Sequence, residues 1–512
     1  MSDVVIPENW CTATIMDVAT ASGGGTPSKS DSSFWDAGTI PWVSPKDMKT
    51  FLIQSSEDLV SSKALGRLTL IPSDSILVVV RSGILSRTLP VSINKVPVTI
   101  NQDMRAFVPE AGIDHRYIAW QLVSQERSIL DRCSKDGTTV ASIEGPALAN
   151  YQLTIAPEKE QTRIVEKLEE LLSELDAGVA ELKAAQRKLA QYRQSLLKAA
   201  VEGSLTADWR AAEARRGEPQ ETGAELLQRI LTERRARWEA KQLAKFAEQG
   251  VAPPKGWQSK YPEPTAPGTD ALTKLPKDWI WSSIGQCFHV AVGATPSRKV
   301  SAYWNGDIPW VSSGEVCFNR ITSTKEQITN NGLSNTSTQI NPAGSVLLGM
   351  IGEGKTRGQV AILDIPATNN QNCAAIWVTN TGIPSEYVYY WLWSRYDETR
   401  RVSSGNNQPA LNKSVVESIP FPLPPLAEVK EIVFLLETAL VQINLQDQAI
   451  ERSLKQAAAQ RKNILKAAFS GKLVPQNPND EPASILLERI RTERAARGDI
   501  GRQRAHKAKE AV

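Results

Sequence analysis

Residues 349–356 have the composition and spacing of a phosphate-binding loop. They read GMIGEGKT, which fits the pattern GxxxxGK[ST] and follows the strand-like run SVLLG. In such a loop, amide groups at the start of a following helix hold the phosphates. The residues that follow here, RGQVAILDIP, are strand-like and end in proline. We therefore expect a β-hairpin loop; the alternative, a P-loop nucleotide hydrolase, requires ATP turnover by the isolated chain.

Metal-dependent and hydrolytic chemistry have few suitable residues. The histidines are His115, His289 and His506, and none stands at metal-ligand spacing from another His or Cys. The five cysteines are widely separated and include no CxxC pair, which argues against a disulfide framework or a zinc module and fits a reducing cytoplasm. The sequence also has no glycine-rich dinucleotide fingerprint and no Asn-Pro-Pro-Tyr-type tetrapeptide for amino-methyl transfer. We expect no catalytic site and no metal site in this chain.

Polar and basic side chains with the chemistry to contact DNA gather in two corresponding sets of loops. Arg, Lys, Asn and Gln read base edges in the major groove, and small hydroxyl residues contact phosphates. The TPS motifs also fit plain turns, and the tryptophans of the two IPWVS motifs, Trp42 and Trp310, are expected in the core. The predicted DNA-binding residues are Thr26, Ser28, Lys29, Lys46, Arg81, Ser82, Arg87, Thr295, Ser297, Arg298, Lys299, Lys355 and Arg357.

The chain that positions these side chains nearly repeats itself. Short motifs return in the same order about 268 residues later, which indicates two tandem units of about 260 residues. The matched motifs are IPENW (6–10) with LPKDW (275–279), GGTPSKSDSSFWDAGTIPWVS (24–44) with GATPSRKVSAYWNGDIPWVS (293–312), Asn101-Gln102 with Asn370-Gln371, and SLLKAAVEGSL (195–205) with NILKAAFSGKL (463–473).

Each unit changes from β-rich to helical at its midpoint. Short apolar runs with Gly and Pro punctuation predict mixed sheet over 1–150 and 276–420. Residues 158–202 and 426–470 lack proline and predict helices of roughly 60 Å, too long for a single-domain core. Apolar positions at heptad spacing predict a seam between them. The seam residues are Leu168, Leu171, Leu175, Leu182, Leu189, Leu196, Ile432, Leu436, Ile443, Ile450 and Ile464, and the first helix adds Gly178, Ala185 and Tyr192.

The expected fold is therefore α+β. Two mixed α/β domains are separated by two long antiparallel helices, which form an intramolecular coiled coil within a pseudo-twofold internal duplication. The predicted divisions are a first β-rich domain at 1–155, a first helical spacer region at 156–250, a Pro-rich linker at 251–276, a second β-rich domain at 277–424, and a second helical spacer region with a C-terminal helical tail at 425–512.

Composition excludes several other classes of protein. The chain has 512 residues, of which 41% are apolar and 22% charged, as in globular proteins. Its 59 basic and 56 acidic residues leave a formal charge of +3, unlike a polybasic membrane or nucleic-acid binder. The longest apolar run, ILVVV, is far shorter than the roughly 18 residues that a membrane span needs. We expect a cytoplasmic protein with no membrane partner.

Together these motifs resemble the DNA specificity subunit of type I restriction–modification enzymes. The shared pattern is TPS…W…IPW, then PLPPLAEVKEIV leading into a long helix, then LKAAFSGKL, with the whole order occurring twice. The first unit departs slightly, with TIAPEKEQTRIV and VEGSL at the last two places. The resemblance covers nearly the whole chain. It implies that the two β-rich domains are target recognition domains, each reading one half of a bipartite asymmetric DNA sequence.

The resemblance also implies the partners. They are double-stranded DNA, two methyltransferase (modification) subunits docked on the paired helices, and restriction/translocase subunits. Adenine-N6 methylation and ATP-dependent cleavage then reside on those partners, together with S-adenosylmethionine, ATP and Mg²⁺, and this chain binds no cofactor. The helices set the spacer between the half-sites. On physics alone, a coiled-coil scaffold spacing two protein-binding domains fits nearly as well; it predicts partner binding without DNA selectivity.

Overall fold

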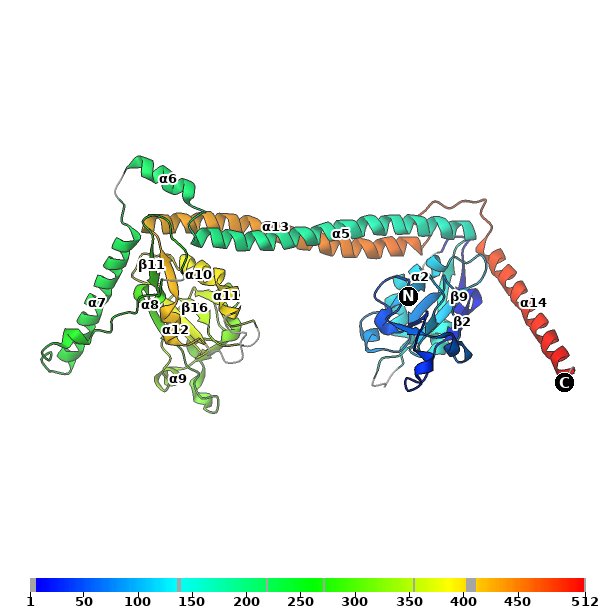
Figure 1. Cartoon of the computed structure of the whole chain (residues 1–512), viewed down its shortest axis with the longest axis horizontal. Helices are drawn as coiled ribbons and strands as arrows, with labels where there is room; N and C mark the ends of the chain where they lie inside the picture. Colours follow the sequence, from blue (N-terminus) through cyan, green and yellow to red (C-terminus); the bar gives the residue numbers. More distant parts are fainter. Residues whose placement is uncertain are drawn as a thin grey trace. The chain divides into compact units, whose positions relative to one another are not determined.

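The chain divides into two compact units. Unit 1 comprises Met1–Lys183 and Ile450–Val512, and unit 2 comprises Ala184–Ala449. Figure 1 labels several elements of both units. The computed structural model describes residues 6–135, 140–217, 220–269, 272–352, 355–401 and 411–510, without the side chains of residues 401 and 498–510.

Unit 1 is built on a five-stranded sheet, a three-stranded sheet and a two-stranded ribbon. The five-stranded sheet has the order β2-β9-β6-β7-β4, and β6 lies at its centre with all four residues buried. A short continuous apolar run such as ILVV is typical of a strand covered on both faces. The strands are β1 (Cys11–Thr14), β2 (Ala19–Gly23), β3 (Ile40–Val43), β4 (Leu52–Ile53), β5 (Asp58–Val60), β6 (Ile76–Val79), β7 (Val91–Asn94), β8 (Thr99–Ile100), β9 (Met104–Pro109) and β10 (Gln152–Ile155).

Unit 2 repeats this arrangement strand for strand. Its sheets have the orders β12-β19-β16-β17-β14 and β15-β13-β18, and β11 pairs with β20 as β1 pairs with β10. The strands are β11 (Ile280–Ser283), β12 (His289–Val292), β13 (Trp304–Val311), β14 (Asn319–Ile321), β15 (Glu326–Ile328), β16 (Val346–Gly349), β17 (Val360–Leu363), β18 (Thr368–Asn369), β19 (Cys373–Trp377) and β20 (Pro420–Leu423).

Helices cover the sheets and extend from the end of each β-rich domain. Short helices are α1 (Ile15–Val18), α2 (His115–Ser124), α3 (Glu126–Cys133) and α4 (Gly145–Ala149) in unit 1, and α8 (Ile284–Cys287), α9 (Asn330–Ser334), α10 (Ser385–Ser394), α11 (Tyr396–Arg401) and α12 (Lys413–Ser418) in unit 2. The long helices are α5 (Glu158–Val201) and α13 (Leu426–Ala468). The remaining helices are α6 (Ala207–Arg216), α7 (Gly223–Glu248) and α14 (Ala483–Glu510).

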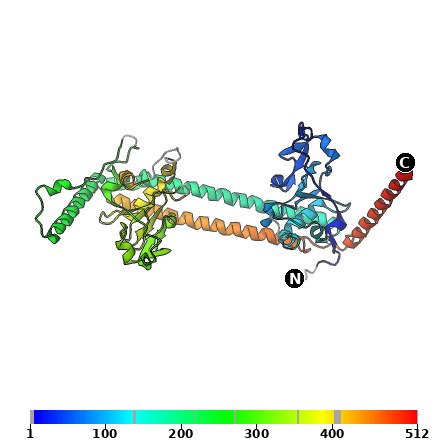
Figure 2. The same cartoon turned by 90° about the horizontal axis from the view of Figure 1, so that it is seen from below.

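The two long helices pack against each other, as Figures 1 and 2 both show. Within unit 2 the Gln186 side chain bonds Asp447, and Arg193 bonds Asn444, so the partner number falls as the α5 number rises. This order defines an antiparallel pair. In unit 1 the Arg461 guanidinium lies 2.6 Å from the Asp176 carboxylate. The expected α+β fold, with two α/β domains and two packed long helices, is confirmed.

Burial along the helix pair is uneven. The residues on its predicted seam that are fully buried are Leu168, Leu196, Ile432, Leu436 and Ile443, and those that are half-buried are Leu171, Leu175, Leu182, Leu189, Ile450 and Ile464. Tyr192, which we expected on the seam, is 55% exposed. The buried stretches lie where each β-rich domain packs its own apolar residues against the helices. Leu168 belongs to the hydrophobic core of unit 1, and Leu196, Ile432, Leu436 and Ile443 belong to that of unit 2.

The segment that follows each long helix bonds a buried glutamate near the start of the other long helix. In unit 2, Glu428 on α13 is 1% exposed and accepts hydrogen bonds from the Trp279 indole (2.8 Å), the Thr206 hydroxyl (2.6 Å) and the Arg210 guanidinium. Thr206 and Arg210 belong to the segment that follows α5. The buried carboxylate is thus an attachment point for a segment far away in sequence.

Unit 1 has the matching arrangement with one chemical difference. Glu160 on α5 accepts hydrogen bonds from the Trp10 indole (3.1 Å) and the Gln476 amide (2.6 Å), and Gln476 belongs to the segment that follows α13. Because Glu160 is buried and these two donors are neutral, its pKa is raised above the usual value. In both units the glycine after the long helix, Gly203 or Gly471, has a positive φ that ends the helix.

We expect Glu428→Gln to destabilise unit 2 by about 3–5 kcal/mol, because it leaves the Arg210 cation half-buried without its carboxylate. Glu160→Gln is the matched control in unit 1. It leaves no cation without a partner; one of the two neutral donors, Trp10 or Gln476, loses its acceptor, so the loss of stability should be smaller, about 1–3 kcal/mol. Hydrogen exchange of the two variants measures each unit separately. If both variants lose the same amount of amide protection against hydrogen exchange, the proposed difference between Glu428 and Glu160 is wrong.

No helix in the described part of the chain is both long enough and apolar enough to span a membrane.

Candidate nucleic-acid interface

The GGTPS motif of unit 1 lies directly across the turn between β8 and β9. A side chain at Gly24 would collide with the carbonyl oxygen of Asn101, so only glycine allows this approach. The Gly25 amide donates to the Ile100 carbonyl at 2.9 Å, and the Trp42 indole donates to the Gly25 carbonyl at 3.0 Å. The loop is therefore fixed against the sheet, and its next residue, Thr26, is held at the surface.

The exposed Thr26 hydroxyl donates a hydrogen bond to the side-chain oxygen of Gln102. Unit 2 repeats the arrangement: the Thr295 hydroxyl donates to the Gln371 side-chain oxygen at 2.5 Å, and the Trp310 indole donates to the Ala294 carbonyl at 3.0 Å. The motifs TPS, IPW and Asn-Gln thus form one substructure in both units. The expectation that both tryptophans belong to the core is confirmed, since Trp42 and Trp310 are buried.

Two of the predicted cations are neutralised by acids at equivalent strand positions. Asp58 and Glu326 stand directly opposite Trp42 and Trp310 in the β3–β5 and β13–β15 pairings. In unit 1 the Lys46 ammonium lies 3.0 Å from Asp58 and 3.0 Å from Glu57, and hydrogen bonds to these two carboxylates raise the pKa of Lys46.

In unit 2 the acid holds a cation from a different loop. Glu326 binds Arg298 through both carboxylate oxygens, one of them at 2.9 Å from Nη2. The guanidinium lies 3.9 Å from the ring centre of Trp304 and 5.3 Å from that of Trp310, within cation–π range. Hydrogen bonding to Glu326 raises the pKa of Arg298. Arg298 is thereby fixed beside a concave surface that Ser301, Asn305 and Lys325 also line.

A second loop of each unit carries the other predicted cations. In unit 1 the β6–β7 loop contains Arg81, whose Nε lies 2.8 Å from Asp103, then Ser82, which caps the 3₁₀ helix Gly83–Ser86, and the exposed Arg87. In unit 2 the β16–β17 loop contains the exposed Lys355 and the half-buried Arg357, whose Nε bonds none of the described residues.

The β16–β17 loop contains most of the motif at residues 349–356. β16 and β17 are antiparallel neighbours, so the connection between them is a hairpin, as expected. A strand and not a helix follows Thr356. Glu353 and Gly354 lie outside the described residues. The remaining predicted residues, Ser28, Lys29, Ser297 and Lys299, are exposed on the TPS loops.

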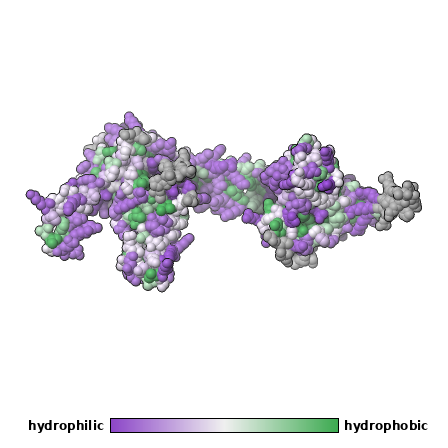
Figure 3. Space-filling view, turned by 60° about the horizontal axis from the view of Figure 1, so that its bottom comes forward, coloured by the Kyte–Doolittle hydropathy of each residue, from purple (hydrophilic) through white to green (hydrophobic). Residues whose placement is uncertain are grey.

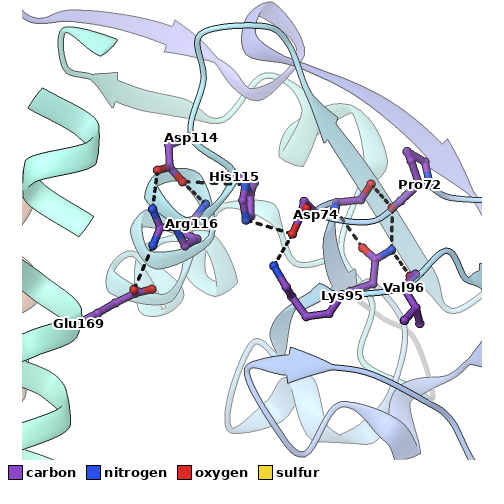
Figure 4. A network of polar contacts seen from close by, with 10 residues as sticks. Pro72, Asp74, Lys95, Val96, Asp114, His115, Arg116 and Glu169 are labelled. Carbon is purple, nitrogen blue, oxygen red and sulfur yellow. Dashed lines mark hydrogen bonds and ion pairs between the residues drawn. The ribbon is translucent and has the colours of Figure 1, made fainter. Parts of the chain in front are cut away.

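A polar network joins the first β-rich domain to α5, as Figure 4 shows. Arg116, at the start of α2, lies 3.2 Å from Asp114 and 3.3 Å from Glu169 on α5. His115 lies 3.4 Å from Asp74, which also pairs with Lys95 at 2.5 Å. Burial lowers the pKa of His115 despite these carboxylates. This network orients the domain on its own part of α5.

Sequence reasoning missed four residues at this surface: Gln102, Gln371, Asp58 and Glu326. The glutamines gave a usable signal, because Asn-Gln recurs at the same place in both units. The acids gave none, since their partners are known only once the strands are paired. In the view of Figure 3, hydrophilic residues cover much of the visible surface of both units, with smaller hydrophobic areas among them.

Comparison with known families gives a match over more than half of the chain. The model described as "Type I restriction modification DNA specificity domain" matches twice, at residues 7–183 and 276–456. The chain is 40% identical over 189 residues to the specificity subunit of the Escherichia coli type I restriction enzyme EcoR124I/EcoR124II, covering 36% of this chain and 47% of that one. It is 23% identical over 423 residues to the Escherichia coli EcoDI specificity subunit, covering 80% and 83%.

The first of these matches is partial. The chain spans about half the length of the EcoR124I/EcoR124II subunit, and 40% of the MjaIX specificity subunit of Methanocaldococcus jannaschii, to which it is 31% identical over 185 residues and 35% of its own length.

Solved structures share the fold. One chain, from work described as the structural basis of complex assembly and conformational transition of the type I R-M system, superposes with a TM-score of 0.63 at 15% identity, covering 91% of this chain and 99% of that one. The HsdS subunit from Thermoanaerobacter tengcongensis gives 0.51 at 16% identity, covering 92% and 99%. With its duplicated fold and two family matches, this chain belongs to the family of type I restriction–modification DNA specificity subunits.

Proposed function

We propose that this chain reads the target of a type I restriction–modification complex, with each β-rich domain reading one half of a bipartite DNA sequence. The observation that carries this proposal is the pair of recognition surfaces: both units build the same loop arrangement, but from different loop residues. Lys46 is neutralised in unit 1 and Arg298 in unit 2. Equal scaffolds with unlike side chains suit two unlike half-sites, so the target is asymmetric.

The chain supplies only part of the charge that DNA requires. Among the predicted DNA-contacting cations, Lys46, Arg81 and Arg298 are each paired with an acid of the same unit, so these three add little net positive charge toward phosphates. Proteins that bind DNA alone usually carry a basic surface. Partner subunits therefore contribute phosphate contacts, and they carry S-adenosylmethionine, ATP, Mg²⁺ and the adenine-N6 methylation and DNA cleavage chemistry, while this chain is non-catalytic.

The helices are proposed to set the spacer and to dock the two methyltransferase subunits. An apolar stripe on α13 supports docking: Phe434, Val441 and Leu445 are 64%, 54% and 52% exposed and follow the spacing i, i+7, i+11 of one helix face. Large apolar side chains grouped on one exposed face mark interaction surfaces. This stripe is the proposed site for one methyltransferase subunit.

The internal repeat does not duplicate this stripe. The corresponding α5 positions hold Glu166, Ser173 and Ala177. The two methyltransferase subunits therefore meet chemically different helix faces, although the helices themselves are related by duplication.

We expect Phe434→Ser to weaken binding of one methyltransferase subunit by at least tenfold, because truncating a large aromatic anchor removes apolar contact from the interface. Sedimentation of the assembly over a concentration series measures the loss as a change from two bound subunits to one. Gln442→Ser, at an exposed neighbour off the stripe, is the matched control. Unchanged stoichiometry in the Phe434 variant would contradict docking on this face.

Reconstitution tests the proposed function directly. The chain, its methyltransferase and labelled S-adenosylmethionine should together methylate DNA at one motif, whereas the chain alone should neither methylate DNA nor hydrolyse ATP. Methylation without sequence preference would favour a simple scaffold. ATP turnover by the isolated chain, abolished by Lys355→Ala, would favour the nucleotide hydrolase.

A further inference from the structure

The Thr–Gln pair is a polar feature of the recognition surface that both units share in full. The acid-neutralised cations differ between the units, and the residues after the TPS motif are Lys29 and Ser30 in one and Arg298 and Lys299 in the other. The pairs Thr26–Gln102 and Thr295–Gln371 keep the same residue types and the same hydrogen bond. A side-chain pair that is retained at the surface while the neighbouring charged residues differ suits something that both half-sites have in common.

We propose that each Thr–Gln pair binds a phosphate of the DNA backbone, through the side-chain amide nitrogen of Gln102 in unit 1 and of Gln371 in unit 2. This inference rests on the proposed function. Every DNA sequence presents the same phosphates, so two domains that read different bases can keep one phosphate contact. Contacts of this type fix the register of a protein on DNA without carrying sequence information.

The chemistry of the pair favours phosphate over a base. A glutamine that reads adenine uses its oxygen and its nitrogen together. Here the threonine hydroxyl donates to the oxygen, which orients the amide and leaves its two N–H groups as the free end. Those nitrogens bond none of the described residues, and both glutamines are exposed. Phosphate oxygens only accept hydrogen bonds, so they match a group that offers donors.

The pair is also held rigidly before any ligand binds. In unit 1 the Asn101 amide bonds the Val43 carbonyl at 2.9 Å, and its side-chain oxygen accepts from the Asp103 amide at 3.0 Å. In unit 2 the Asn370 amide bonds Val311 at 3.0 Å, and its side-chain oxygen accepts from the Asn372 amide at 3.2 Å. A contact group fixed in this way loses little conformational entropy on binding.

Single substitutions in the assembled complex test the proposal. Gln102→Ala should weaken binding to the target duplex and to an unrelated duplex by the same factor, about three- to tenfold. The salt dependence should stay unchanged, because a neutral donor displaces no counterion. Gln102→Glu keeps an acceptor for the Thr26 hydroxyl but places a negative charge at the phosphate, so its loss should be larger. Gln54→Ala, at an exposed glutamine of the same domain, is the control.

Target duplexes carrying one neutral methylphosphonate at a time locate the contact. With the unsubstituted complex, one such duplex should lose affinity in the half-site read by unit 1, and that loss should vanish in Gln102→Ala. Gln371→Ala should behave the same way in the other half-site only. If no methylphosphonate couples to either glutamine, or if Gln102→Ala relaxes a single base position, the phosphate assignment is overturned.

These outcomes are separable from failure of the proposed function. An unsubstituted complex that shows no preference for its target duplex contradicts the function itself. A selective complex whose glutamine variants bind both duplexes normally contradicts only the phosphate contact.

Discussion

Replacing the first β-rich domain with that of a relative will change one half of the target sequence and leave the other half unchanged. Each mismatched base pair typically costs about 1–3 kcal/mol, so several changed bases together remove the old specificity by roughly a thousandfold or more. The physical reason is that each unit forms its own sheets, core and loops. Mapping of methylated bases in cells that carry the hybrid measures both halves at once.

The structure indicates where to cut. β1 and β10 pair with each other, and the hydrogen bonds that Glu160 accepts from Trp10 and from Gln476 involve residues outside these two strands. Exchange of residues 15–151 therefore preserves the β1–β10 pairing and the hydrogen bonds of Glu160 in unit 1. Exchange of residues 284–419 is the matched control for the second half-site. A change in both half-sites from either exchange would show that the domains do not read independently.

Lengthening both long helices by one turn will lengthen the tolerated spacer by one or two base pairs. One turn of helix is about 5.4 Å and B-DNA rises about 3.4 Å per base pair, so the added length corresponds to that range. The effect is large because a fixed spacer rejects targets of any other length. Binding of the assembly to a series of duplexes with increasing spacer lengths measures it.

The insertions belong in a stretch of the helix pair where none of the residues is fully buried. On α5 this stretch lies between Asp176 and Gln186, and on α13 between Asp447 and Arg461, so the ion pair and hydrogen bonds on either side keep their register. Insertion in α5 alone is the control, because it should misalign the pair and abolish binding. If the doubly lengthened chain keeps its original spacer, the helices do not act as the ruler.

Local patterns in the sequence were enough to predict the main architecture. Helices such as α5 follow from an unbroken run without proline, and their pairing follows from leucines such as Leu168 and Leu196 at heptad spacing. The antiparallel pairing of β16 and β17 follows from the strand-like residues after Thr356. These features depend on neighbours in sequence or on a repeated motif. The predicted DNA contacts of the loop residues, and the domain boundaries, remain predictions.

The parts that could not be predicted depend on contacts between distant residues. The ion pair of Arg298 with Glu326 could not be predicted, because Glu326 becomes its neighbour only when β13 and β15 pair. Likewise, nothing near Glu428 in sequence indicates that Arg210 closes over it. Tyr192 fits the heptad pattern, yet it is exposed. Periodicity shows which residues share a helix face, but not which part of that face the β-rich domains bury.

The most direct test of the central claim is to map methylated adenines in the DNA of a host that carries this chain and its methyltransferase. We predict one motif with two unlike halves separated by a fixed number of unspecified bases, with one methylated adenine on each strand. A continuous or palindromic motif, or methylation that does not depend on this chain, would contradict it.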